Sequence, residues 1–246
     1  MSHLNRCVGL TRLPGRCCRF SSVLNVKNLL VPWKSVPMKM LYPNDPKRPE
    51  IAMGARARQS PYFERIRERG ACMYSVYNHM LMATSYGNPE REYDLLMNHA
   101  AIWDVGCERQ VQLEGPDAMK LAQLMSPRNV EKCKIGQGFY TPILARDGGV
   151  INDPILLKLS EELIWLSIAD SDVKLYAKGL ADAYNLDVEV TEPDVSPLAI
   201  QGPRAEDVVA SVFGEDIRKI RYFYFIETEV DGIPLVLQRS GWSKQG

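Results

Sequence analysis

The sequence predicts an α+β fold in which most strands pair antiparallel. Strand-like and helix-like segments are interspersed along its 246 residues, without the strict alternation that produces a parallel α/β sheet. Two short turns with glycine, Asp147-Gly148-Gly149 and Asp231-Gly232, each stand between apolar runs and predict β-hairpins. Because a hairpin joins neighbouring antiparallel strands, both turns favour antiparallel sheet.

The individual elements follow from capping residues and hydrophobic periodicity. Helices are expected at 62–69, from Asn88-Pro89 to about Ala100, at 117–125, at 172–184 and after Gly202-Pro203, where Val208, Val209 and Val212 are expected to face inward. Strands are expected at 109–113, 140–145, 155–159, 163–169, 186–191, 198–201, 222–229 and 233–238.

The segment Met73–Met82 is dense in methionine and aromatic residues, and two interpretations stay open for it. It is either a core strand or a stretch whose flexible methionine side chains line a pocket. His79 lies within this apolar run, where a single histidine is more often a buried core residue than a catalyst.

The N-terminal region is basic and contains no acidic residue before Asp45. Arginine-rich, acid-poor composition at the N-terminus is typical of a mitochondrial transit peptide, so we expect one at 1–22 and a location in the mitochondrial matrix. A disordered basic tail is the alternative. The following segment, 23–61, is rich in proline and predicts an extended linker.

Composition and motifs exclude several classes of function. The formal net charge of zero gives no indication of a nucleic-acid partner, and no apolar run approaches the roughly 20 residues needed to span a membrane. Neither a nucleotide-binding glycine motif nor a metal motif is present. Cys72, Cys107 and Cys133 are far apart in the sequence, so we expect no metal site and free, buried thiols.

One acidic residue stands at a break between two strands. Pro154 has no N–H for a neighbouring strand, so the ladder is expected to open there or to lie at a sheet edge. Asp153 precedes it and is therefore expected to be a polar group held by rigid surroundings. Taken by itself, this segment favours the alternative, an ordinary turn with a solvated aspartate.

Six motifs in the same order resemble one family. They are YNHML (77–81), WDVGCERQVQLEGPDA (103–118), GGVINDP (148–154), WLSIADSDV (165–173), EPDVSPLAIQGP (192–203) and RSGWSKQG (239–246). Together they resemble the folate-binding superfamily of the glycine-cleavage aminomethyltransferase, or T-protein. The residues of these motifs are more similar to those of the dimethylsulfoniopropionate demethylase branch of this superfamily.

The resemblance implies a fold of three parts around a central tetrahydrofolate. The first folate-binding subdomain corresponds to 62–195, and the second, incomplete, to 196–246. The C-terminal barrel of the family is not expected in this chain. The position of the family's pterin-binding glutamate would come after Gly246. Asn152 stands where T-proteins have an additional acid, and the histidine of their Asp-Val-Ser-His element is missing at Cys107.

The resemblance also implies site residues. Asp153 corresponds to the catalytic aspartate and faces the folate, and Trp242 occupies the position of an aromatic residue that contacts the folate. Tyr140, an aromatic residue outside the six motifs, is a further candidate for binding the folate. Tyr77, Trp242 and Lys244 are the candidates for binding the substrate, and no metal is implied. Other aromatic side chains available to a cationic donor are Tyr74, Trp103 and Trp165, and Arg109 and Arg239 join Lys244 as candidates for the donor's carboxylate.

Three functions therefore stay open. The first is a tetrahydrofolate-dependent methyltransferase that demethylates a small sulfonium compound, which Asn152 and Trp242 favour. The second is a glycine-cleavage aminomethyltransferase, whose partner would be a lipoyl carrier protein. The third is a non-catalytic fragment that binds folate or another chain.

Overall fold

The computed structural model describes residues 57–241 and 243, all within one compact unit of the chain, Met53–Gly246. The expected transit peptide, the linker up to residue 56, Trp242 and Lys244 lie outside the described residues. None of the helices in the described part is long and apolar enough to cross a membrane.

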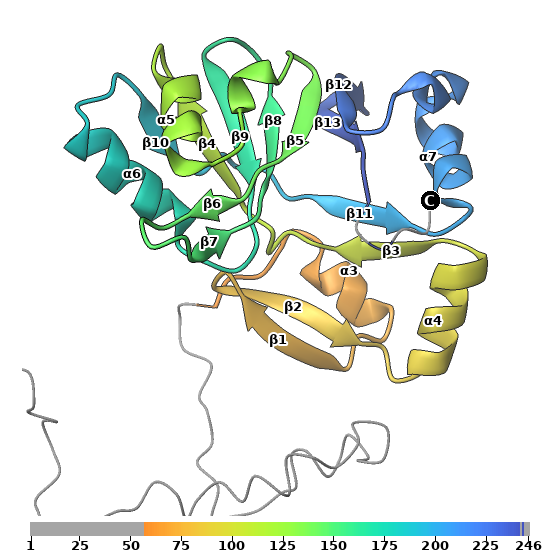
Figure 1. The fold of residues 1–246 in the computed structure, drawn as a ribbon. Helices are drawn as coiled ribbons and strands as arrows, with labels where there is room; N and C mark the ends of the chain where they lie inside the picture. The colour runs from red at the N-terminus through yellow and green to blue at the C-terminus, as the bar shows by residue number, and fades with distance from the viewer. Residues whose placement is uncertain (1–56, 242, 244–246) are drawn as a thin grey trace, which may run out of the picture. The chain divides into compact units, whose positions relative to one another are not determined.

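Helices and strands are interspersed along the described chain (Figure 1). The helices are α3 (Phe63–Glu68), α4 (Pro89–Asn98), α5 (Ala118–Met125), α6 (Val173–Ala183) and α7 (Ala205–Phe213), with short 3-10 helices η3 (Val130–Lys132) and η4 (Glu215–Lys219). The strands are β1 (Met73–Tyr77), β2 (Met80–Ser85), β3 (Ala101–Asp104), β4 (Gln110–Glu114), β5 (Gln137–Tyr140), β6 (Ile143–Leu144), β7 (Val150–Asn152), β8 (Ile155–Lys158), β9 (Leu163–Ser167), β10 (Glu189–Thr191), β11 (Leu198–Gln201), β12 (Tyr224–Val230) and β13 (Ile233–Arg239).

The predicted α+β class with antiparallel sheet is confirmed. The largest sheet has seven strands in the order β10-β4-β9-β8-β5-β12-β13, and every adjacent pair in it is antiparallel. Three two-stranded antiparallel sheets, β1-β2, β11-β3 and β6-β7, complete the described part. The division at 195/196 stays a prediction, although β11 and β12, which follow it, pair with β3 and β5, which precede it.

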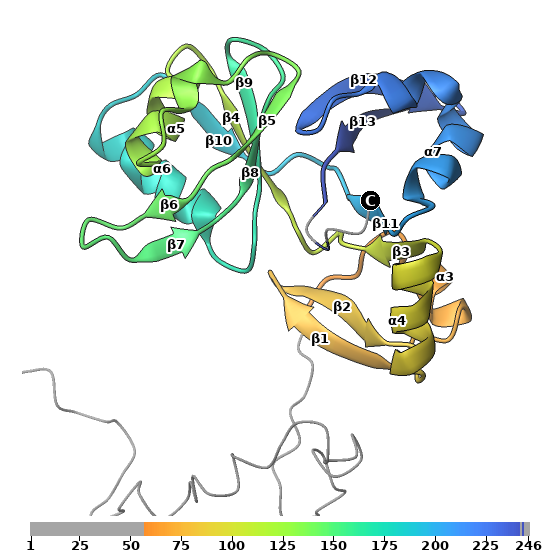
Figure 2. The ribbon, with the colours of Figure 1, turned by 45° about the vertical axis from the view of Figure 1, so that its right-hand side comes forward.

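The two faces of the large sheet have different environments. Figures 1 and 2 place α5 and α6 on one side of β4, β9 and β8, with β11 and α7 on the other side. The row Val111, Leu166 and Leu156 is buried in the core with both helices. Because side chains alternate along a strand, the next row, formed by Gln110, Ser167, Ile155 and Tyr140, points to the opposite face.

A strand, a Gly-Pro pair and a helix follow one another twice in the chain. Gly115 stands between β4 and α5, and Gly202 stands between β11 and α7, with φ angles of +136° and +119°. A Cβ atom at either position would lie 2.6 Å from a backbone oxygen, that of Asp187 or that of His99. Glycine is therefore required at both turns, because only glycine combines this φ with such close backbone approach.

The interpretation of Met73–Met82 as one core strand is wrong. Asn78 and His79 both have positive φ angles, 49° and 62°, and reverse the chain between β1 and β2. Two consecutive residues with positive φ form the turn that best matches the twist of a hairpin, and asparagine tolerates this conformation. The side chain of His79 is 56% exposed, 3.7 Å from the Asp172 carboxylate, so the expectation of a buried histidine is also wrong.

Helix α7 buries different residues from those expected. Ala205 and Ala210 face the interior, Val208 and Val209 are half-buried, and Val212 is 58% exposed. The expectation that all three valines face inward is therefore wrong for Val212.

The cysteines of the described part are all free, as expected, but they differ in exposure. Cys107 and Cys133 are buried, whereas Cys72 is exposed. Burial raises the pKa of the Cys107 thiol to about 12 and that of the Cys133 thiol to about 11. Both buried thiols are therefore protonated at neutral pH and behave as small apolar side chains.

Candidate functional site

The structure brings two of the predicted site residues into contact. Asp153 lies at the break between β7 and β8, where its side chain is exposed, and Tyr140 is the last residue of β5. The Tyr140 hydroxyl donates a hydrogen bond of 3.1 Å to Oδ2 of Asp153. This hydrogen bond to the carboxylate raises the pKa of Tyr140, a residue that is 46% exposed.

The backbone around this pair is fixed by buried neighbours. Tyr140 pairs with Ile155 across β5 and β8, and the next residue, Thr141, donates its N–H to the carbonyl of Pro154 at 2.8 Å. Pro154 and Thr141 are both fully buried. The ladder does open at Pro154, as predicted, and β6 and β7 continue beyond it as a separate two-stranded sheet.

Asn152 immediately precedes Asp153 and is buried, with only 4% of its surface exposed. Its Nδ2 donates to the carbonyl of Ala169 at 3.0 Å and to Oγ of Ser171 at 2.7 Å. Its Oδ1 accepts the backbone N–H of Ala169 at 3.0 Å. This arrangement uses both side-chain N–H donors, so a carboxylate at position 152 cannot reproduce it.

Asn78 holds the same loop from the other side. Its Nδ2 donates to the carbonyls of Ala169 and Cys107, both at 3.0 Å, and its Oδ1 accepts the backbone N–H of Ser171 at 3.0 Å. We call Asn78 and Asn152, bound to Ala169 and Ser171, the asparagine clamp. Tyr77 and Asp153, two predicted site residues, are the chain neighbours of its two asparagines.

Tyr77 ends β1 in a half-buried position. Burial raises the pKa of its phenol, a hydrogen bond with the backbone of Asp170 acts in the opposite direction, and the charge of Glu108 raises it further. Glu108 itself is half-buried, and its burial raises the pKa of its carboxyl group above the ordinary value of 4.5. The two side chains are therefore close enough to interact electrostatically.

The arginines expected to be available to a substrate carboxylate are occupied. Nε of Arg109 donates to Glu192 at 2.8 Å, and its Nη2 contacts the second oxygen of the same carboxylate. Arg58 binds Glu192 as well, at 2.9 Å. Arg239 pairs with Glu206 at 2.9 Å and also donates to two backbone carbonyls, so neither Arg109 nor Arg239 is free to bind a substrate.

Two of the other aromatic candidates have structural contacts. Tyr74 packs its ring against Phe63 with a centroid distance of 5.3 Å. Trp165 donates from Nε1 to Oε1 of Gln112 at 2.8 Å across β4 and β9. Of the predicted substrate-binding residues, Tyr77 alone falls within the described part, since Trp242 and Lys244 lie outside it.

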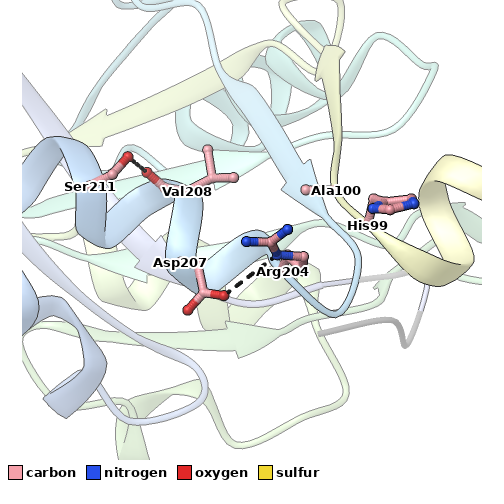
Figure 3. Close-up of a pocket in the computed structure, with 6 residues that line it drawn as sticks. All are labelled: His99, Ala100, Arg204, Asp207, Val208 and Ser211. Atoms are coloured by element: carbon pink, nitrogen blue, oxygen red, sulfur yellow. Dashed lines mark hydrogen bonds and ion pairs between the residues drawn. The ribbon is translucent and has the colours of Figure 1, made fainter.

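A separate hollow of about 370 Å³ lies between α4 and α7 (Figure 3). It is lined by His99, Ala100, Arg204, Asp207, Val208 and Ser211. Arg204 pairs with Asp207 at 3.8 Å, and the Ser211 hydroxyl donates to the carbonyl of Val208 at 2.7 Å. Arg204, Asp207 and Ser211 thus have local partners, and none of the lining residues belongs to the Asp153 site.

Sequence reasoning missed three residues of the site. Asn78, Ser171 and Glu108 were part of motifs but received no role. The Asn-His pair between two apolar runs was the available signal for a hairpin turn at Asn78. The sequence carried no signal for the burial of Glu108. In the described residues, no group of three or more histidine, cysteine or acidic side chains is arranged to hold a metal ion.

Residues 62–246 match the family model of the GCVT N-terminal domain. This chain belongs to that family. The match covers the Tyr140–Asp153 pair and the asparagine clamp.

Two curated relatives show how the chain stands within the GCVT family. It is 46% identical over 191 residues to dimethylsulfoniopropionate demethylase DmdA of Ruegeria pomeroyi, which covers 78% of this chain and 52% of the relative. It is 26% identical over 189 residues to an aminomethyltransferase of Desulfitobacterium hafniense, covering 76% of this chain and again 52% of the relative. The chain thus spans about half the length of these relatives.

The fold agrees with that of a solved GCVT relative. The structure of glycine cleavage system aminomethyltransferase T from Bartonella henselae superposes with a TM-score of 0.64 over 75% of this chain and 50% of that chain. At 23% identity, this similarity establishes the aminomethyltransferase-type fold of the described part.

Proposed function

We propose that this chain forms the folate-facing part of a tetrahydrofolate-dependent one-carbon transferase that demethylates a small sulfonium compound. The observation that carries the proposal is the exposed Asp153 carboxylate, hydrogen-bonded to Tyr140 and held in a rigid frame by Asn152 and Pro154. The greater identity to a sulfonium demethylase, 46% against 26% for an aminomethyltransferase, supports this donor class.

The residues of the site fit a reduced pterin. Asp153 offers a carboxylate to an amine N–H, and the exposed ring of Tyr140 offers an aromatic face on which a planar ring can stack. Both groups stand on strand ends whose backbones are bound to buried residues. Their positions are therefore set before the ligand arrives, which lowers the entropic cost of binding.

The chemistry requires alignment more than a strong base. Tetrahydrofolate supplies a secondary amine that accepts the methyl group when it is bound. The leaving group of a sulfonium donor departs as a neutral thioether, so no residue has to protonate it. Asp153 stabilises the positive charge that develops on the accepting amine, and the rigid frame holds the reacting atoms in line, which is worth several kcal/mol.

Calorimetric titration of the full chain with tetrahydrofolate tests the folate part of the proposal. Wild type is expected to bind, and Asp153→Asn is expected to bind about 10- to 100-fold more weakly, because a hydrogen bond to a charged group contributes about 1.5–3 kcal/mol. Asp182→Asn, an exposed aspartate on α6, is the matched control. Equal affinity of Asp153→Asn and wild type would remove Asp153 from the site.

The donor is tested separately by a methyl-transfer assay. Dimethylsulfoniopropionate is expected to be demethylated, and Asp153→Ala is expected to abolish the transfer without unfolding the chain, because Asp153 is exposed. Transfer from an aminomethyl-lipoyl carrier protein and not from the sulfonium would instead identify the aminomethyltransferase subtype and its carrier as partner.

A binding role without catalysis is the second candidate. The chain spans 52% of its relatives, and a part of a transferase is able to bind folate without completing the catalytic site. Binding of tetrahydrofolate with no transfer from either donor would identify this role.

The basic N-terminal segment supports a location in the mitochondrial matrix, with cleavage near residue 22. A fluorescent fusion at the C-terminus is expected to reach mitochondria, and the purified fusion is expected to begin near residue 23. Replacing Arg12, Arg16 and Arg19 by alanine is expected to leave the fusion in the cytosol. Unchanged import of that variant would contradict the transit peptide.

A further inference from the structure

We propose that Glu108 and the ring of Tyr77 together bind the positively charged group of the methyl donor. The inference rests on the proposed function, because it assigns the cationic donor to one part of the same site. It separates that site into two regions. Asp153 and Tyr140 belong to the folate region, and Glu108 and Tyr77 belong to the donor region.

Glu108 is a half-buried carboxylate that forms no ion pair and whose side chain accepts no hydrogen bond within residues 57–241. The adjacent cation, Arg109, does not compensate it, since its Nε and Nη2 bind the carboxylate of Glu192. An uncompensated carboxylate in this position is costly, because burial removes water without providing a partner. Desolvated carboxylates of this kind cluster at functional sites.

The position of Glu108 places it beside the face of the sheet that carries Tyr140. Gln110 donates from Nε2 to the carbonyl of Glu108 at 3.1 Å and to Oγ of Ser167 at 3.0 Å. Gln110, Ser167, Ile155 and Tyr140 form one row across β4, β9, β8 and β5. The backbone of Glu108 is therefore fixed at one end of this row, and Tyr140 stands at the other end.

Hydrogen bonds link Tyr77, in the donor region, to the folate region. The segments of Tyr77 and Glu108 lie side by side, because Nδ2 of Asn78 donates to the carbonyl of Cys107 at 3.0 Å. The charge of Glu108 accordingly contributes to the raised pKa of the Tyr77 phenol and of the Cys107 thiol, after burial as the largest cause. Asn78, which follows Tyr77, binds the carbonyls of Cys107 and Ala169. Asn152, which precedes Asp153, binds the same Ala169 carbonyl. The asparagine clamp thus fixes the donor region relative to the folate region.

A carboxylate beside an aromatic ring is suited to a small organic cation. The carboxylate supplies a counter-charge, and the aromatic face attracts a cation that, like a methylated sulfonium, has no N–H to donate. The donor loses its positive charge as the neutral thioether leaves. Glu108 therefore stabilises the bound donor more than the transition state, and its removal should raise KM and leave kcat unchanged or higher.

The test compares Glu108→Gln with wild type in three measurements on the full chain. Calorimetry with dimethylsulfoniopropionate is expected to give at least tenfold weaker binding for the variant. Calorimetry with tetrahydrofolate is expected to agree within about twofold. Thermal unfolding is expected to occur at the same or a higher temperature, because the substitution removes an uncompensated buried charge. Glu114→Gln, at the exposed end of β4, is the control.

The outcomes separate this inference from the proposed function. Unchanged sulfonium affinity of Glu108→Gln would overturn the inference while the proposed function stands. A marked fall in unfolding temperature would also overturn it, because Glu108 would then have a structural partner. Wild type that binds tetrahydrofolate and no sulfonium would overturn the donor class together with the inference. Wild type that binds neither would overturn the proposed function itself.

Discussion

Asn78 and Asn152 donate to the same acceptor, since the Nδ2 atom of each lies 3.0 Å from the carbonyl oxygen of Ala169. The two asparagines are 74 positions apart in the sequence (78 and 152). One follows Tyr77 at the turn of the β1–β2 hairpin, and the other precedes Asp153 at the break between β7 and β8. A single loop therefore sets the relative position of two predicted site residues.

We expect Asn152→Asp to destabilise the chain by about 1–3 kcal/mol. The substitution keeps the shape of the side chain, but it loses both N–H donors and places a charged oxygen against the Ala169 carbonyl. Urea unfolding followed by circular dichroism measures the change.

The control for this substitution is Asn129→Asp. Asn129 is exposed, so its replacement is expected to change stability by no more than about 0.5 kcal/mol. Equal stability of both variants would show that the hydrogen bonds of Asn152 contribute nothing to the fold.

Asp153→Asn is expected to lower the pKa of Tyr140 towards its ordinary value of 10.0. The hydrogen bond to the Asp153 carboxylate is the largest cause that raises this pKa, and a neutral amide stabilises the protonated phenol less. NMR titration of ring-labelled tyrosine measures the shift, with Tyr140→Phe to assign the signal.

The same titration tests the clamp. If Asn152 positions Asp153, Asn152→Asp should also lower the pKa of Tyr140, although it removes neither partner of the hydrogen bond. Asp182→Asn should leave the Tyr140 titration unchanged. A Tyr140 pKa that is unaffected by Asn152→Asp would show that Pro154 and Thr141 suffice to hold the carboxylate.

Glu108→Gln is expected to change how stability depends on pH. Burial raises the folded-state pKa of Glu108 above the ordinary value of 4.5, so the folded chain binds its proton more tightly than the unfolded chain. Wild type should therefore lose stability relative to the variant as pH rises from about 4.5 through the folded-state pKa. Above that pKa the difference should be constant.

Unfolding temperatures of both proteins between pH 4 and pH 8 measure this difference. Subtracting one curve from the other removes the contributions of neighbouring groups such as Asp104 and Asp170, which the substitution leaves in place. Tyr77 and Cys107 titrate well above this range, because their pKa values are raised. Parallel curves over the whole range would contradict the raised pKa of Glu108.

Among Cys72, Cys107 and Cys133, we expect Cys72 alone to react with a thiol reagent at pH 8 in the folded chain. Cys72 is exposed, whereas the other two are buried and their pKa values are raised to about 12 and about 11. Peptide mapping by mass spectrometry after iodoacetamide treatment identifies the modified residue. All three should react in urea, and modification of Cys107 without urea would indicate local opening around the Asn78 contact.

Much of the fold followed from local sequence patterns. The turns at Gly148 and Asp231-Gly232 and the cap at Asn88-Pro89 are properties of a few adjacent residues, so they were predictable. The reversal at Asn78-His79 was missed because the apolar residues continue on both sides of it. In that position the positive φ of Asn78 competes with the strand pattern, and the sequence alone does not show which prevails.

The site was predictable only in part. Asp153 could be named from a motif and Tyr140 as an aromatic candidate, but their 3.1 Å contact joins residues from separate strands and only the structure shows it. The commitment of Arg109 to Glu192 could not be foreseen, because the partner lies 83 residues further along the chain. The same reason hid the role of Ser171, whose hydroxyl accepts a hydrogen bond from Asn152 in β7 and whose N–H donates to Asn78 in the β1–β2 turn.

The sequence by itself determined the fold class, the antiparallel hairpins, the family resemblance and the polar break at Asn152-Asp153-Pro154. These features depend on φ preferences, periodicity and the missing N–H of proline, which act within a few residues. Only the tertiary structure decided which charges are satisfied and which are not. Arg109 is neutralised by Glu192, and Glu108 has no partner among the described residues, because burial and hydrogen bonding depend on segments that meet after the chain has folded.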